Sequence, residues 1–341
     1  MDRRAAAGRD LIQRDPGIRD PGTVVDGGLY GPGSEAWALN REAMLLLGAG
    51  PRALLLQVAH PLIAAGVDQH SDFRSDPWGR LAGTLRSYLR IVYGTGARAR
   101  AEIRRLNELH RGIRGEVHEP EARARHGASY TARDPELSLW VHATLVDSTI
   151  VAYDAWIEPL SDERRARYYA ETLPIAAAFG IPASVLPQDL GAFEDYLATM
   201  LEPGGAVVVG DVARELSAAI LHPPLGPAAA MLGEPSAALA PWLDAIPATW
   251  YDWLFWPSIE LLPDSVREGY GLPWGTRQRI VSAWLVAAWQ AWRPVLPTAF
   301  RTMPQALQAD RRVAAGLAPA GMPEPARVHA PPRGPAVVSG T

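Results

Sequence analysis

Histidines are the residues of this sequence best suited to chemistry, and four stand in or beside apolar helical patterns. They are His60, His70, His110 and His142. His110 shares one helical face with Ile103 and Leu106, because residues three, four or seven positions apart recur on the same side of a helix. Burying an imidazole without a partner is costly. The pattern fits either an axial haem ligand or a core histidine bonded to a backbone carbonyl.

A second candidate group is Arg80 and Thr84, which lie one helical turn apart and therefore share a face. Gly83 between them allows a bulky group to approach the backbone. An arginine and a hydroxyl on one face could bind a haem propionate or dioxygen. The alternative is a solvated, salt-bridged face, which the nearby Arg86 and Arg90 favour.

The other histidines have less specific surroundings. His142 lies in a helix that is apolar nearly all round, so we expect its imidazole to meet a ligand, a cofactor propionate or Asp147. His60 precedes Pro61 and could bond a carbonyl that the proline leaves free, which favours a structural role over ligation. His70 lies in a polar turn, at a pocket mouth or as a cap. The remaining histidines are expected at the surface: His118, His126, His222 and His329.

Several familiar sites are excluded by spacing. A ferritin-like di-iron site needs Glu three residues before His, but those positions hold Val67, Asn107 and Leu139. The chain has no H-E-x-x-H, G-x-S-x-G or Walker motif, and its glycine pairs do not follow strands. A non-haem metal hydrolase built from His60, His70 and a carboxylate such as Asp68 or Asp72 remains an alternative.

Composition limits the chemistry further. The 341 residues include 33 basic and 37 acidic ones, a net charge of −4 that gives no general reason to expect nucleic acid or an anionic membrane as partner. Every basic residue is Arg, which excludes lysine chemistry. The absence of Cys excludes thiolate ligation and iron–sulfur clusters. With no signal-type apolar core and no transmembrane run, we expect a cytoplasmic protein, and a homodimer is left open.

Helical patterns cover almost the whole chain, so the predicted fold class is all-α, a single multi-helix domain. We expect that domain at residues 31–313, after a flexible arm at 1–30 and before a disordered Pro/Ala/Gly-rich tail at 314–341. The expected helices include Ser34–Leu47, Arg52–Gly66 broken at Pro61, Asp76–Tyr93, Thr95–Ile113, Asp134–Ile157 and Ser161–Phe179. Ala206–Val209 is the one candidate strand.

In combination these motifs resemble the MpaB/latex-clearing (rubber oxygenase) superfamily, most clearly from Leu39 to Leu221. The motifs that carry the resemblance are Arg41-Glu42-Ala43, Leu54-Leu55-Leu56-Gln57-Val58-Ala59-His60-Pro61, Gly66-Val67, His70-Ser71, Arg80-Leu81 with Thr84, Leu109-His110 with Arg114-Gly115, Tyr130-Thr131-Ala132, Asp134-Pro135 and Trp140-Val141-His142-Ala143-Thr144. The Trp140-Val141-His142 motif is typical of the shorter bacterial members.

The resemblance implies a globin-like domain that holds haem b and acts with dioxygen on a small apolar substrate, isoprenoid-like or aromatic. It places the proximal iron ligand at His110 and the distal arginine and threonine at Arg80 and Thr84, with His142 and His60 shaping the pocket. The rubber-cleaving branch has Lys directly before that threonine, whereas this chain has Gly83. This departure predicts a different or more open distal pocket. A haem- or lipid-binding carrier without turnover is the alternative.

Overall fold

The computed structural model describes residues 27–71, 76–222, 224–231, 236–247 and 251–317. The predicted arm at 1–30 and tail at 314–341 fall mostly outside these residues. Where residues 314–317 are described they continue the last helix as a π-helical turn, η5 (Val313–Leu317), so the helical part extends slightly beyond the predicted boundary at 313.

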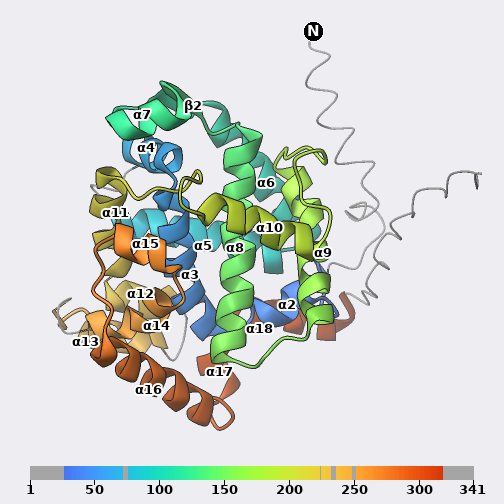
Figure 1. The fold of residues 1–341 in the computed structure, drawn as a ribbon. Coiled ribbons are helices and arrows are strands. Elements are labelled where there is room, and N and C mark those ends of the chain that lie inside the picture. The colour runs from blue at the N-terminus through green and yellow to red at the C-terminus, as the bar shows by residue number, and fades with distance from the viewer. Residues whose placement is uncertain (1–26, 72–75, 223, 232–235, 248–250, 318–341) are drawn as a thin grey trace, which may run out of the picture.

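The prediction of an all-α fold is confirmed (Figure 1). The first half of the chain forms α2 (Glu35–Leu39), α3 (Ala43–Ala59), α4 (Pro61–His70), α5 (Pro77–Tyr93), α6 (Gly96–Arg111), α7 (Pro120–His126), α8 (Pro135–Trp156) and α9 (Asp162–Ala178). The second half forms α10 (Leu190–Leu201), α11 (Asp211–Leu221), α12 (Leu225–Met231), η2 (Ser236–Leu239), α13 (Ala240–Leu243), η4 (Asp252–Phe255), α14 (Trp256–Glu260), α15 (Asp264–Gly269), α16 (Thr276–Trp292), α17 (Thr298–Arg301) and α18 (Pro304–Arg312).

Local capping signals set the starts of the helices that matter most for the site. The side chain of Asp76 accepts from the Gly79 amide at 2.8 Å, and Thr95 accepts from Arg98 at 3.2 Å, so α5 and α6 begin where the sequence predicts. Asp134 likewise caps α8, accepting from the Glu136 amide at 2.9 Å. These bonds satisfy amides that would otherwise lack partners at a helix start.

The centre of the core is the contact between α3 and α8 (Figure 1). The indole of Trp140 is fully buried and donates to the Leu56 carbonyl at 3.0 Å. At the other end of the contact α3 presents Gly48 to the ring of Trp156, and a Cβ at Gly48 would lie 1.7 Å from that ring. A glycine is therefore required there for the two helices to approach this closely.

A sharp bend separates α3 from α4, as the predicted break at Pro61 requires. His60 stands between the two helices in extended conformation and Pro61 is the first residue of α4. Among the described residues no single helix has the length and apolarity to cross a membrane. The α3–α4 pair meets those two criteria only when taken together, and it is bent by 101°.

Two predicted elements are wrong. The helix expected from Ser34 to Leu47 is instead two helices, and α3 runs on through Gly48 and Pro51 because burial against α8 outweighs the local breakers. Residues 206–209 form no strand. The short strands β1 (Arg114–Glu116) and β2 (Ser129–Thr131) pair antiparallel elsewhere, with Arg114 opposite Thr131. Three-residue strands are too short to give an alternating sequence pattern.

Candidate functional site

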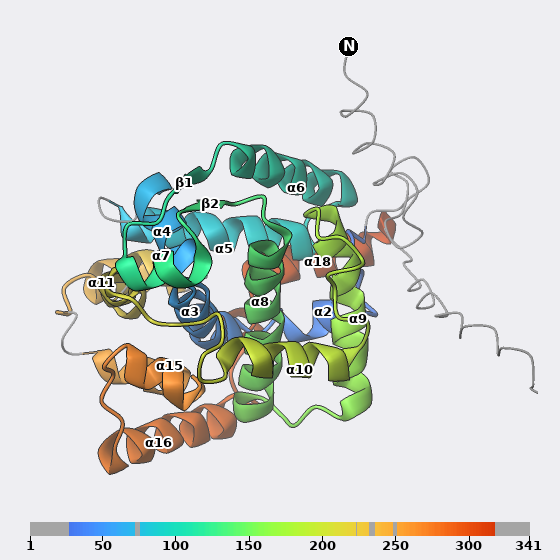
Figure 2. The same cartoon turned by 45° about the horizontal axis from the view of Figure 1, so that its top comes forward.

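Helices α5 and α6 form an antiparallel hairpin that brings Arg80 and His110 to the same end. Arg80 lies 14 residues before Gly94, and His110 lies 15 residues after Thr95. Because both helices rise about 1.5 Å per residue from the turn between them, the two residues reach nearly the same height. Figure 2 shows the two helices side by side near the upper ends of α8 and α9.

Arg80 and Thr84 share a helical face, as their spacing indicates. Arg80 Nη1 donates to Thr84 Oγ1 at 2.5 Å, and that hydroxyl donates to the Arg80 carbonyl at 3.1 Å. A Cβ built on Gly83 would meet nothing within 4 Å, so the space beside this helix turn is open. The pair is an arginine and a hydroxyl held together next to open space, which suits recognition of an anionic or oxygen-bearing group.

The surroundings of His110 favour the neutral form of its imidazole. Burial lowers its pKa, and the positive charge of Arg80 lowers the pKa further. Within the described part of the chain neither ring nitrogen makes a hydrogen bond, although the ring is half-buried. A neutral imidazole with a free lone pair is the form that binds a metal ion.

A buried carboxylate holds the hairpin together below this site. Glu102 on α6 is only 6% exposed and accepts from the Ser87 hydroxyl on α5 at 2.7 Å. Arg105 donates to Glu102 at 2.6 Å, and Arg90 completes an ion pair with it at 3.3 Å. These partners, chiefly Arg105, lower the pKa of Glu102 to about 2. The network fixes the register of α5 against α6 and with it the relative position of Arg80 and His110.

His142 lies on α8 and contacts α9. Its Nε2 is 3.3 Å from the Thr172 hydroxyl, which itself donates to the Tyr169 carbonyl at 2.7 Å. Since that hydroxyl proton is already used, His142 Nε2 must carry the proton that it donates, which leaves Nδ1 as an acceptor. Burial lowers the pKa of His142 to about 4, so the ring is neutral. His142 thus has an internal partner, one of the expected alternatives, but this partner is Thr172 and not Asp147, which pairs with Arg52 at 2.6 Å.

His60 caps α4. Its Nδ1 accepts from the Leu62 amide at 3.3 Å, a structural role as expected, but with an amide as partner where the sequence predicted a carbonyl. Burial, with the adjacent His126, lowers the pKa of His60 to about 4. The two rings lie 5.0 Å apart between centroids. His126 is half-buried, so its predicted surface position is wrong; the apolar Ala122 on the same face of α7 is the sequence signal that could have indicated this.

The remaining histidines lie away from these groups. His118 and His222 are exposed as expected, and His329 lies outside the described residues. His70 ends α4, where its Nε2 contacts the Arg114 carbonyl at 2.9 Å. His60 and His70 therefore stand at opposite ends of a helix about 15 Å long, too far apart to share one metal ion. In the described ranges no group of three His, Cys, Asp or Glu residues is placed to hold an ion.

Comparison with known families identifies the domain. The model of the family described as "ER-bound oxygenase mpaB/B'/Rubber oxygenase, catalytic domain" matches residues 37–293, from α2 to the end of α16. The match covers most of the chain and all of the candidate site. The chain belongs to this family of oxygenase catalytic domains.

Individual relatives add little about activity. "Uncharacterized protein Rv2237" of Mycobacterium tuberculosis and "Uncharacterized protein Mb2261" of Mycobacterium bovis are each 27% identical over 154 residues. The matched part is 44% of this chain and 57% of each relative, so it spans little more than half the length of those proteins. No solved structure matches the chain.

Proposed function

We propose that this protein is a haem b-dependent oxygenase that acts with dioxygen on a small apolar molecule. The observation that carries the proposal is His110, a neutral, half-buried imidazole whose ring nitrogens make no hydrogen bond within the described residues. His110 would hold the haem iron, and the haem would supply the oxygen chemistry. The protein would supply ligation, orientation and exclusion of water.

Arg80 lies close enough to His110 for its charge to lower the pKa of that imidazole. Burial lowers the pKa of Arg80 itself, although its side chain remains exposed. Arg80 and His110 would therefore both face the haem, from the same end of the α5–α6 hairpin.

Each of the other site residues would have a separate task. Arg80 would orient dioxygen or a haem propionate, because its guanidinium carries donors next to open space, and Thr84 would hold that guanidinium in place by accepting its hydrogen bond. His142 and His60 would shape the pocket without binding iron, since each ring already has a partner in the protein. Ile91, Ile103 and Ile175 pack together between α5, α6 and α9, so the hairpin that carries Arg80 and His110 rests on an apolar cluster, in keeping with an apolar substrate. The cytoplasmic location stays a prediction.

Oxygen uptake tests the enzymatic part of this proposal. Protein produced with a haem precursor is purified and supplied with isoprenoid and aromatic compounds, and dissolved oxygen is recorded with and without an electron donor. We expect substrate-dependent uptake that Arg80→Gln lowers by about 10-fold or more, because a charged donor to the oxygen is lost. A haem-loaded protein that consumes no oxygen with any of these compounds would be a carrier, contrary to the proposal.

A further inference from the structure

Helix α16 exposes large apolar side chains to water in addition to those that it packs against the core. Its polar residue Ser282 is fully buried and donates to Glu260, whereas Ile280 and Trp284 are 63% and 64% exposed. A surface helix of a globular protein normally directs its apolar face into the core and its polar face to water. Here the inner side of α16 packs on α14 and α8, and the outer side is apolar as well.

The exposed residues form a continuous strip along the helix, which we call the α16 strip. It consists of Ile280, Ala283, Trp284, Ala287 and Ala291. Beyond the strip the chain continues with further exposed apolar side chains, Trp292, Val295 and Phe300. Scattered exposed apolar residues are ordinary, but a contiguous strip that holds one large aromatic ring, Trp284, with a second, Trp292, just beyond its end marks an interaction surface. In Figures 1 and 2 α16 lies at the lower edge of the molecule, far from α6.

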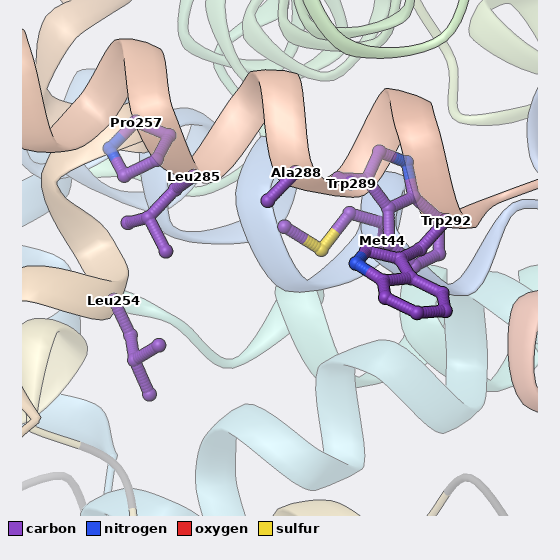
Figure 3. A pocket seen from close by; sticks show the side chains of 7 residues that line it. All are labelled: Met44, Leu254, Pro257, Leu285, Ala288, Trp289 and Trp292. Carbon is purple, nitrogen blue, oxygen red and sulfur yellow. The ribbon is translucent and has the colours of Figure 1, made fainter.

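An apolar groove of about 270 Å³ lies alongside the strip, between α16, α3 and α14 (Figure 3). Its lining residues are Met44, Leu254, Pro257, Leu285, Ala288, Trp289 and Trp292. Trp292 belongs both to the groove and to the exposed surface, so the two are continuous. The Trp289 indole nitrogen is buried and has no hydrogen-bond partner within the described residues. Apart from this N–H the lining side chains are apolar, so the groove offers an apolar recess at the edge of the strip.

The charge of this segment differs from that of the whole chain. No Asp or Glu occurs between Glu268 and Asp310, while the same stretch carries four arginines, at positions 277, 279, 293 and 301. Arg293 pairs with Glu42 at 2.7 Å, so Arg277 and Arg279, both exposed on α16, supply the positive charge of that helix. The overall charge of −4 thus conceals a tryptophan-rich helix whose own charged residues are all basic. The nearly equal numbers of basic and acidic residues in the whole chain do not indicate this local charge, because composition averages over the chain.

We propose that the α16 strip docks the protein on an anionic lipid bilayer. Tryptophan with arginine at the edge of an apolar helix face is the chemistry of the membrane interface, where the rings enter the headgroup region and the guanidinium groups meet phosphate. A second copy of this chain fits less well, because it would bring the same exposed arginines, Arg277 and Arg279, against each other. The groove beside Trp292 would take part of one lipid chain.

Vesicle sedimentation with the full chain tests this proposal. The protein is mixed with vesicles of phosphatidylcholine alone or with added phosphatidylglycerol, and bound protein is measured at low and high salt. We expect binding to the anionic vesicles that weakens with salt. Ile280→Ser combined with Trp284→Ser should lower it at least about 10-fold, and Arg279→Gln about fivefold. Since these side chains are exposed, the folded state should be unchanged by circular dichroism.

Leu109→Ser is the matched control, because Leu109 is also exposed, at 54%, but lies on α6 at the other side of the molecule. It should bind vesicles like the unmodified protein. Three results would overturn the proposal: no binding to either vesicle, equal binding by the Ile280/Trp284 variant, or a dimer in solution that this variant converts to monomer. The last result would assign the strip to a subunit interface.

Discussion

Arg80 and His110 lie at the same end of the α5–α6 hairpin, and the positive charge of Arg80 lowers the pKa of His110. The relationship depends on the turn at Gly94 and Thr95 and on the buried Glu102 that ties the two helices together. It gives the site a histidine kept neutral beside a fixed positive charge. A neutral imidazole can bind iron, and a nearby guanidinium can bind the oxygen or carboxylate groups that accompany it.

Removing the charge of Arg80 should raise the pKa of His110. In haem-free Arg80→Gln protein we expect this pKa to rise but to stay below the ordinary value of about 6.5, because burial, the larger cause, remains. Proton NMR titration of the imidazole measures it. Arg86→Gln, an exposed arginine on the same helix, serves as the control and should leave the pKa where it is. An unchanged pKa in Arg80→Gln would show that the two groups do not interact.

The close approach of α3 to α8 should make Gly48 intolerant of any side chain. Gly48→Ala places a methyl group 1.7 Å from the buried ring of Trp156, so we expect a loss of about 2 kcal/mol or more of the free energy of unfolding. Gly50→Ala in the same helix meets nothing within 4 Å apart from its chain neighbours, and because its gain in helix propensity is opposed by Pro51 it should change the free energy of unfolding by less than about 1 kcal/mol. Urea denaturation compares the two. If the two substitutions changed the free energy of unfolding equally, then α3 and α8 would lie farther apart at Gly48 than the structure has them.

The ion pair between Arg52 and Asp147 should matter more than surface pairs do. Arg52 is buried and donates to Asp147 at 2.6 Å, to Ser148 at 2.8 Å and to the Leu261 carbonyl at 2.7 Å. Arg52→Ala leaves the carboxylate and the carbonyl without their donor, so we expect a loss of about 3 kcal/mol of the free energy of unfolding. Glu108→Ala breaks an exposed pair and should cost less than about 0.5 kcal/mol. If both substitutions lowered the free energy of unfolding by a similarly small amount, the buried ion pair between Arg52 and Asp147 would matter no more than a surface pair.

Acid should destabilise the protein through His60. Its pKa is about 4 in the folded chain and about 6.5 when unfolded, so between these values only the unfolded chain binds the proton. Stability from this group is complete above about pH 6.5 and is lost as the pH falls toward 4. His60→Asn keeps an acceptor at the helix start. In this pH window the free energy of unfolding of His60→Asn should fall less steeply than that of the unmodified protein, by about 1.4 kcal/mol per pH unit. Unfolding measured at several pH values gives the two slopes.

His118→Asn is the control for the acid experiment, because His118 is exposed. It should show the same dependence on pH as the unmodified protein. If His60→Asn also keeps that dependence, then His60 is not the titrating group, and His142, whose pKa is likewise about 4, becomes the main source.

Features with local causes could be predicted from the sequence, and features with distant causes could not. Asp76, Thr95 and Asp134 cap helices within three residues of themselves, so their helices begin as predicted. The path of α3 through Gly48 depends on Trp156, a residue far along the chain. No pattern in the residues around Gly48 indicates its contact with Trp156.

The same distinction applies to the site. The shared face of Arg80 and Thr84 follows from helical periodicity alone, and the structure has their side chains hydrogen-bonded. The partner of His142 does not follow from it, because Asp147 is taken by Arg52 and the Thr172 hydroxyl arrives from α9. The sequence also does not reveal which side of an apolar helix faces water. The exposure of Trp284 therefore could not be predicted from it.

The absorption spectrum of purified protein, produced with a haem precursor, tests the central claim most directly. The account predicts a haem spectrum for the unmodified protein, with one porphyrin per chain by pyridine haemochrome assay, and loss of most of that haem in His110→Ala. His142→Ala should keep its haem, because that ring is already bonded to Thr172. A colourless, metal-free protein, or His110→Ala with full haem content, would contradict the assignment of His110 as the iron ligand.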